Sequence, residues 1–185
     1  MIAYVFWHWK KPDVPADEYE KRQRDFHAAL AAAPPAGFIM SLSASVAGLP
    51  WTDSEAAYED WYLVQDFGSL GSLNEGAVSG SRSGPHDAAA AAARDGAGAV
   101  YALRHGEPTS HQRHALWFNK PAGMSYRDCF AQLLPRIDEV RGALWIRQMA
   151  LGPARELCMQ GDRPLSLPPA FEVIQSPLRQ VWPLP

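Results

Sequence analysis

The stretch "VFWHWKKP" at residues 5–12 has a counterpart in "ALWFNKP" at residues 115–121. Both stretches are rich in aromatic and β-branched residues, and both stop at a Lys-Pro pair, which is typical of a strand followed by a turn. A helical pattern follows each of them, and the two patterns share the local match of "RDFHAAL" with "RDCFAQLL". The chain is therefore predicted to contain the same structural unit twice.

The first unit is predicted to run in the order β-α-β-β-α-β, which is the ferredoxin-like order. A helical stretch starts after Asp66, whose side chain can act as its N-cap, and another begins at Pro85 and stops at Gly96. Between them, "GSRSGPH" (80–86) is expected to form a mobile connecting loop. The other predicted elements are strands at 3–9, 37–48, 60–65 and 98–105 and a first helix at 15–33.

The second unit repeats this order in a shortened form. A helix at 125–140 is expected to start from Ser125 as N-cap and to be kinked or divided at Pro135. The stretch "GDRPLSLPPA" is too short and too rich in proline for a second helix, so one helix is missing from this unit. The predicted strands lie at 114–121, 143–152 and 156–160, with a last one somewhere in 171–182.

These patterns predict an α+β fold of two ferredoxin-like repeats, at residues 1–107 and 108–185. A four-stranded sheet with helices on one face leaves its other face uncovered, and exposed apolar surface costs on the order of 25 cal/mol per Å². Two such sheets packed face to face cover each other and form a barrel with helices outside. The repeats are therefore expected to form one structural unit and not two independent domains.

This arrangement resembles the dimeric α/β barrel superfamily, here as a tandem-duplicated single chain that forms a pseudo-dimer. The resemblance implies that small aromatic or polyketide-like molecules, or heme, bind in the barrel interior or between the sheet and its helices. Members of the superfamily include cofactor-independent monooxygenases, polyketide cyclases and heme-degrading enzymes. The resemblance implies a function by analogy only.

Alternation along the strands gives the candidate site residues, because successive side chains point to opposite faces. On the first strand Tyr4, Phe6 and His8 share one face, which is expected to line the barrel interior. His8 is the candidate general base, since histidine titrates near neutral pH. Arg147 is the candidate for holding a carboxylate or enolate oxygen. The other candidate ligand-binding residues are Ser41, Tyr62, His105, Trp117 and Trp145.

Composition excludes several classes of partner. The net charge of −3, with mixed signs along the chain, offers no basic stripe for nucleic acid, and no apolar stretch is long enough to cross a membrane. The start of the chain lacks the features of a signal peptide, and the two cysteines fit free thiols in a reducing compartment, so a cytoplasmic location is expected. The histidines near 105–114 have no zinc spacing, and neither a metal nor another cofactor is expected.

Three functions remain open from the sequence. The first is a small-molecule-binding barrel that acts as a cofactor-free enzyme, similar to a monooxygenase or a cyclase, on an aromatic or polyketide-like substrate. The second is a binding or structural barrel without catalysis. The third is a heme protein that uses one of its histidines as the axial ligand. Association into a homodimer is also left open.

Overall fold

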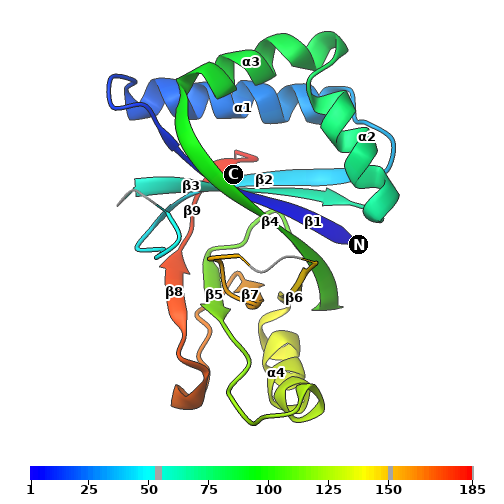
Figure 1. Cartoon of the computed structure of the whole chain (residues 1–185), viewed down its shortest axis with the longest axis vertical. Coiled ribbons are helices and arrows are strands. Elements are labelled where there is room, and N and C mark those ends of the chain that lie inside the picture. Colours follow the sequence, from blue (N-terminus) through cyan, green and yellow to red (C-terminus); the bar gives the residue numbers. More distant parts are fainter. Residues whose placement is uncertain (53–55, 150–151, 185) are drawn as a thin grey trace.

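A computed structural model describes residues 1–52, 56–149 and 152–184 of the chain. The described residues form one nine-stranded sheet in the order β8-β5-β7-β6-β4-β1-β3-β2-β9 (Figure 1). The strands are β1 (Ile2–Lys10), β2 (Phe38–Ala47), β3 (Ala56–Val64), β4 (Ala93–Gly106), β5 (His114–Phe118), β6 (Ala143–Gln148), β7 (Leu157–Gly161), β8 (Ile174–Pro177) and β9 (Arg179–Trp182).

The helices lie at the two ends of the molecule, outside the sheet (Figure 1). Three of them, α1 (Ala16–Ala32), α2 (Phe67–Ala77) and α3 (Ser83–Ala92), gather on the side of β1 to β4, and α4 (Tyr126–Val140) lies at the opposite end. Two short 3-10 helices, η1 (Gly80–Arg82) and η2 (Pro169–Phe171), complete the described elements. No described helix is both long and apolar enough to cross a bilayer.

The sheet comes close to closing on itself through the segment 174–182. Its first part, β8, pairs with β5, and its second part, β9, pairs with β2 at the other end of the strand order. The chain therefore has an α+β fold with a nearly closed antiparallel barrel. The strands of residues 1–107 lie in the order β4-β1-β3-β2, and four strands of residues 108–185 lie in the order β8-β5-β7-β6. The fourth, first, third and second strand of each part thus follow one another in the sheet.

Two helix starts confirm the predicted caps. The side chain of Asp66 accepts a hydrogen bond from the backbone N–H of Ser69, and that of Ser125 accepts one from Asp128. Helix α4 runs through Pro135 as a single element, so of the two predicted effects of this proline, a kink or a division, the division does not occur. Between β7 and β8, where the structure describes every residue, the only helical element is η2, so the expectation that this stretch holds no full helix is confirmed.

Two local predictions in the first half are wrong. Residues 80–86 form η1 and the start of α3, where the Arg82 side chain donates to the backbone oxygens of Gly76 and Ala33. Gly96 lies inside β4, because α3 already ends at Ala92. A Cβ at Gly96 would stand 2.5 Å from Cζ of Phe6, so glycine here makes room for an aromatic ring of the neighbouring strand.

The barrel interior is filled by side chains from strands that lie far apart in the sheet. Trp7, Trp61, Trp117 and Trp145 meet there with Tyr101, and all five are almost fully buried. The inward positions predicted for Trp117 and Trp145 are confirmed. For β1 the prediction is wrong, because Val5 and Trp7 face inward while Tyr4, Phe6 and His8 face the helices. Both faces of β1 are covered, so the alternation of its side chains does not show which face points into the barrel.

Candidate functional site

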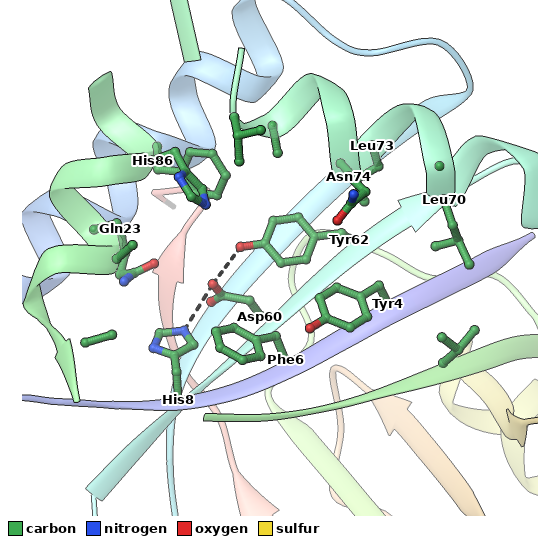
Figure 2. A pocket seen from close by; sticks show the side chains of 18 of the residues that line it. Tyr4, Phe6, His8, Gln23, Asp60, Tyr62, Leu70, Leu73, Asn74 and His86 are labelled. Carbon is green, nitrogen blue, oxygen red and sulfur yellow. Dashed lines mark hydrogen bonds and ion pairs between the residues drawn. The ribbon is translucent and has the colours of Figure 1, made fainter. Parts of the chain in front are cut away.

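A cavity of about 650 Å³ lies between the first half of the sheet and helices α1 to α3. Tyr4, Phe6 and Tyr62 stand on the sheet side, while Leu73 of α2 and His86 of α3 face them from the helices (Figure 2). The size suits a small molecule, and the lining is mostly apolar and aromatic with a few polar groups at one place. Neither lysine nor arginine is among the described residues that line this cavity.

The polar groups converge on Asp60, a fully buried residue of β3. Its Oδ2 accepts a hydrogen bond of 2.9 Å from the Tyr62 hydroxyl. The same oxygen lies 3.1 Å from Nε2 of His8 and 3.3 Å from Nε2 of His27. One carboxylate oxygen thus has a phenol and two imidazoles around it, and Figure 2 shows the contacts with Tyr62 and His8 at the cavity wall.

His8 is held between this carboxylate and a second phenol. Its Nδ1 lies 2.6 Å from the hydroxyl of Tyr19, and its ring stacks on Tyr58 with centroids 5.7 Å apart. A carboxylate only accepts hydrogen bonds, so the assignment that satisfies both contacts places a proton on Nε2 toward Asp60 and leaves Nδ1 to accept from Tyr19. This orients the basic nitrogen of His8 toward Tyr19, which also lines the cavity.

The charge state of the carboxyl group follows from its neighbours. Burial alone would raise the pKa of Asp60, but His8 and His27 outweigh that effect and hold it well below its ordinary value. Asp60 is therefore a carboxylate. Burial, with the Asp60 charge as the second cause, raises the pKa of Tyr19 and of Tyr62, so both phenols keep their protons and act as donors.

Local sequence explains how these groups meet. Alternation along β3 sends Asp60 and Tyr62 toward the helices and Trp61 into the barrel. On α1, Tyr19, Gln23 and His27 follow one another at four-residue spacing and are all buried against the sheet. The strand β3 and the helix α1 therefore supply polar side chains that meet at one place between the sheet and the helices.

Glu59 lies beside Asp60 in the sequence but on the other side of the sheet. Its Oε2 accepts from the indole N–H of Trp7 at 2.8 Å, and its Oε1 accepts from that of Trp61 at 2.6 Å. Burial, only partly offset by these two hydrogen bonds, raises the pKa of Glu59 to about 7. The two adjacent acids thus have opposite surroundings, and only Asp60 lines the cavity.

Of the residues predicted from the sequence, three belong to this region. His8 and Tyr62 line the cavity, although they do so beneath the helices and not inside the barrel. Ser41 is also turned away from the barrel interior, because its Oγ lies 2.7 Å from Nδ1 of His27 on α1. The alternation argument therefore assigned the faces of β1 and β2 the wrong way round. It grouped the side chains of β1 correctly, but on β2 an irregularity between Phe38 and Met40 puts Phe38 on the helical side.

The remaining predicted residues lie outside the cavity. Trp117 and Trp145 are packed in the barrel interior. The guanidinium of Arg147 donates to the backbone oxygens of Gly152 and Ala154, so it supports a nearby loop. His105 pairs with Asp138 of α4 at 2.7 Å on the outer surface. The structure thus separates Arg147 from His8, which the sequence placed in one pocket.

Sequence reasoning missed four residues of the polar cluster, namely Tyr19, Gln23, His27 and Asp60. A signal for Asp60 exists, because "EDWYLV" places two acids inside a strand that is otherwise apolar, and acids are rarely buried without partners. The helical residues gave no such signal, since Tyr19 also fits an ordinary apolar stripe. Within the described ranges, no group of three or more histidine, cysteine, aspartate or glutamate side chains is placed to hold a metal ion.

The fold and the cavity together define an α+β barrel protein with a space of small-molecule size beneath its helices. Among solved structures the chain is similar to an anthrone oxidase-like protein, with 9% identity and a TM-score of 0.51 over 97% of this chain and 90% of that chain. It is also similar to a chlorite dismutase-like protein, with 10% identity and a TM-score of 0.45 over 97% of this chain and 95% of that chain. The first likeness agrees with the dimeric α/β barrel fold. No protein-family model matches the chain, and no curated protein sequence does.

Proposed function

We propose that this protein binds a flat aromatic molecule in the cavity beneath α1 to α3 and removes a proton from it. The observation that carries the proposal is the His8 imidazole, which is held in the cavity wall between the Tyr19 hydroxyl and the Asp60 carboxylate. A carboxylate behind an imidazole fixes its tautomer and stabilises the imidazolium that forms when it accepts a proton. This is the arrangement of a general base.

The lining argues for the chemical class of the ligand. Aromatic rings on the sheet side favour a planar ring system, and a cavity without lysine or arginine among its described lining residues favours a ligand that is neutral when it enters. The ligand must also carry a proton that a base can remove. Enolisable aromatic ketones meet these conditions, and an anthrone, named in the description of one fold neighbour, is such a ketone.

The proposed reaction is oxidation of the ligand by dioxygen without a cofactor. The proton of an acidic C–H group passes to the Tyr19 oxygen while the Tyr19 proton passes to Nδ1 of His8, and the enolate that remains reacts with dioxygen. Overall, a CH₂ group and one O₂ give a C=O group and one water, so the carbon loses four electrons and dioxygen gains them. Asp60 stabilises the positive charge on His8 throughout.

Substitution of His8 by glutamine tests this role. Glutamine can still donate toward Asp60 and accept from Tyr19, but it cannot take up a proton at neutral pH. With anthrone as the probe, dioxygen uptake should fall by about 10²-fold or more, while binding of anthrone, followed by tryptophan fluorescence, should change little. His105→Gln is the matched control, because it alters another histidine that pairs with an aspartate, but on the outer surface.

Equal uptake by the two variants would contradict the proposed base. Uptake that is absent in the unaltered protein, together with saturable anthrone binding, would instead support the second function, a binding barrel without catalysis.

The heme alternative has a separate test. Both ring nitrogens of His8 are in contact with other groups, so His8 could ligate iron only by losing Tyr19 or Asp60. We therefore expect that hemin added to the protein gives no stoichiometric Soret shift at a one-to-one ratio. A saturable shift that is lost in His86→Gln, the other cavity histidine, would establish the heme reading and displace the base proposal.

We also propose that residues 1–107 and 108–185 are two copies of one duplicated unit. The support is the shared placing of strands in the two halves, together with the repeated sequence at 5–12 and 115–121. In this view the second copy has lost the helices that correspond to α2 and α3, which supply one wall of the cavity in the first copy.

A further inference from the structure

One hydroxyl in the cavity wall stands apart from the hydrogen bonds around Asp60. Tyr4 of β1 lines the cavity (Figure 2), and among the residues that the structure describes its hydroxyl has no hydrogen-bond partner. The hydroxyls of the other five tyrosines each contact one, and these tyrosines are Tyr19, Tyr58, Tyr62, Tyr101 and Tyr126. A phenol carries its proton at neutral pH and can donate it to a hydrogen bond. Tyr4 therefore offers the cavity a donor that no described residue uses.

The neighbouring strand β4 sets the direction of the Tyr4 ring. Tyr4 is paired with Val100, but a Cβ added at Gly98, two residues earlier, would stand 2.7 Å from the Tyr4 hydroxyl oxygen. Gly98 is itself the partner of Phe6. The Tyr4 ring thus leans toward Phe6, because the glycine leaves room for it there, and Figure 2 shows the hydroxyl on that side of the ring.

Tyr4 and His8 stand at the two ends of a row of rings on β1. The Phe6 ring lies between them, with its centroid 6.1 Å from that of Tyr4 and 5.2 Å from that of His8. All three side chains line the cavity, because residues two apart on a strand point to the same face. A flat ligand that lies over Phe6 would therefore have the proposed base at one edge and the Tyr4 hydroxyl at the opposite edge.

The reaction proposed above needs a polar group at that opposite edge. When the C–H bond of the ligand breaks and the proton leaves, the electron pair of the bond is delocalised onto the carbonyl oxygen of the ketone. In an anthrone the CH₂ group and the carbonyl group lie on opposite sides of the central ring, so negative charge develops on the side away from the base. A donor that already stands where charge develops lowers the barrier of such a step.

We infer that the Tyr4 hydroxyl donates a hydrogen bond to the carbonyl oxygen of the ligand and stabilises the enolate. Only the catalytic use of this hydrogen bond rests on the function proposed above. Ligands that fit both ends of the row are flat ketones whose carbonyl group lies across the ring system from the acidic C–H group. Asn74 and His86 also line the cavity, but they stand on helices α2 and α3, whereas Tyr4 shares one strand with His8.

Recognition of the carbonyl group can be measured without any reaction. Fluorenone is a flat three-ring ketone without an acidic C–H group, and fluorene has the same rings with a CH₂ group in place of the carbonyl. Tyr4→Phe should weaken binding of fluorenone by about fivefold, the effect of one neutral hydrogen bond, and leave binding of fluorene nearly unchanged. Tyr126→Phe, which removes an exposed hydroxyl outside the cavity, should change neither affinity. Quenching of tryptophan fluorescence gives both affinities.

The carbonyl stretching band of bound fluorenone tests the contact itself. A hydrogen bond to the oxygen lowers the stretching frequency, so the band should lie lower in the unaltered protein than in Tyr4→Phe. A purely structural role of Tyr4 would not move the band. With anthrone, the kcat of dioxygen uptake should fall by about 10²-fold in Tyr4→Phe, while KM should rise only by the roughly fivefold expected for fluorenone.

Equal losses of affinity for the two compounds, or a carbonyl band that Tyr4→Phe leaves in place, would overturn the inference. A selective loss of fluorenone binding in Asn74→Ala and not in Tyr4→Phe would overturn it as well. Failure of the general-base proposal would look different. The unaltered protein would then take up no dioxygen with anthrone, while its preference for fluorenone over fluorene would still depend on Tyr4.

Discussion

Asp60→Asn should lower the free energy of unfolding at pH 7 by about 3 to 5 kcal/mol, the cost of removing one partner from a buried ion pair. The amide has nearly the size of the carboxyl group, so packing is preserved. Two imidazoles and the Tyr62 hydroxyl, however, lose the oxygen charge around which they are arranged. Urea denaturation followed by tryptophan fluorescence measures the change.

The effect of this substitution should depend on pH in a defined direction. The folded-state pKa of Asp60 lies below its ordinary value of 3.8, so the carboxylate contributes its stability above that pH and loses it as the pH falls further. Asp138→Asn is the control, because Asp138 also pairs with a histidine but is exposed, and it should cost less than about 1 kcal/mol. Similar losses in the two variants would mean that the Asp60 cluster is not the strong interaction described above.

Glu59→Gln should have an effect that grows with pH. Burial holds the folded-state pKa of Glu59 at about 7, against an ordinary value of 4.5. Between these values the folded protein keeps the proton and the unfolded chain has lost it, so the unaltered protein loses stability as the pH rises through this range. Glutamine does not ionise. The stability of the variant relative to the unaltered protein should therefore rise by about 3 kcal/mol from pH 4 to pH 8.

The comparison of variant with unaltered protein removes other contributions. In the glutamine variant, the amide NH₂ faces an indole N–H group from which Glu59 accepts a hydrogen bond. The loss of this hydrogen bond lowers the stability by the same amount at every pH. Asp60 and the other titrating groups occur in both proteins and cancel in the difference. Glu75→Gln, at an exposed position of α2, should show no such pH dependence. A difference between Glu59→Gln and the unaltered protein that stays constant from pH 4 to pH 8 would contradict the buried, protonated state of Glu59.

The order of elements could be predicted from the sequence because local signals agree with the fold. Asp66 and Ser125 start helices as expected, and the Lys-Pro pairs at 11–12 and 120–121 each follow the end of a strand, β1 and β5. The faces of β1 could not be predicted, because Val5 and Trp7 on one side and Tyr4 and Phe6 on the other are equally apolar. A strand between a barrel interior and a helical layer has no solvent-exposed face. Its pattern of apolar residues therefore does not tell which face points into the barrel.

The candidate site could be predicted only in part for a related reason. His8 and Tyr62 were found because polar or aromatic groups on a buried strand stand out. His27 belongs to a helix whose exposed face is also polar, so nothing in its spacing separates it from a surface residue. The meeting of His8 and His27 at one oxygen of Asp60 depends on the crossing of α1 over β1 and β3, which no local pattern encodes.

The segment 174–182 has a consequence for synthesis of the protein. It pairs first with β5 and then with β2, and its Arg179 pairs with Glu20 of α1 while its Trp182 packs on His27. During synthesis these residues leave the ribosome after all the remaining strands of the sheet, β1 to β7. Until they do, the outer edge of β2 lacks a neighbour and one face of the His27 ring is bare. Unpaired strand edges promote association between nascent chains, so we expect the edge of β2 to be prone to such association until the last residues emerge.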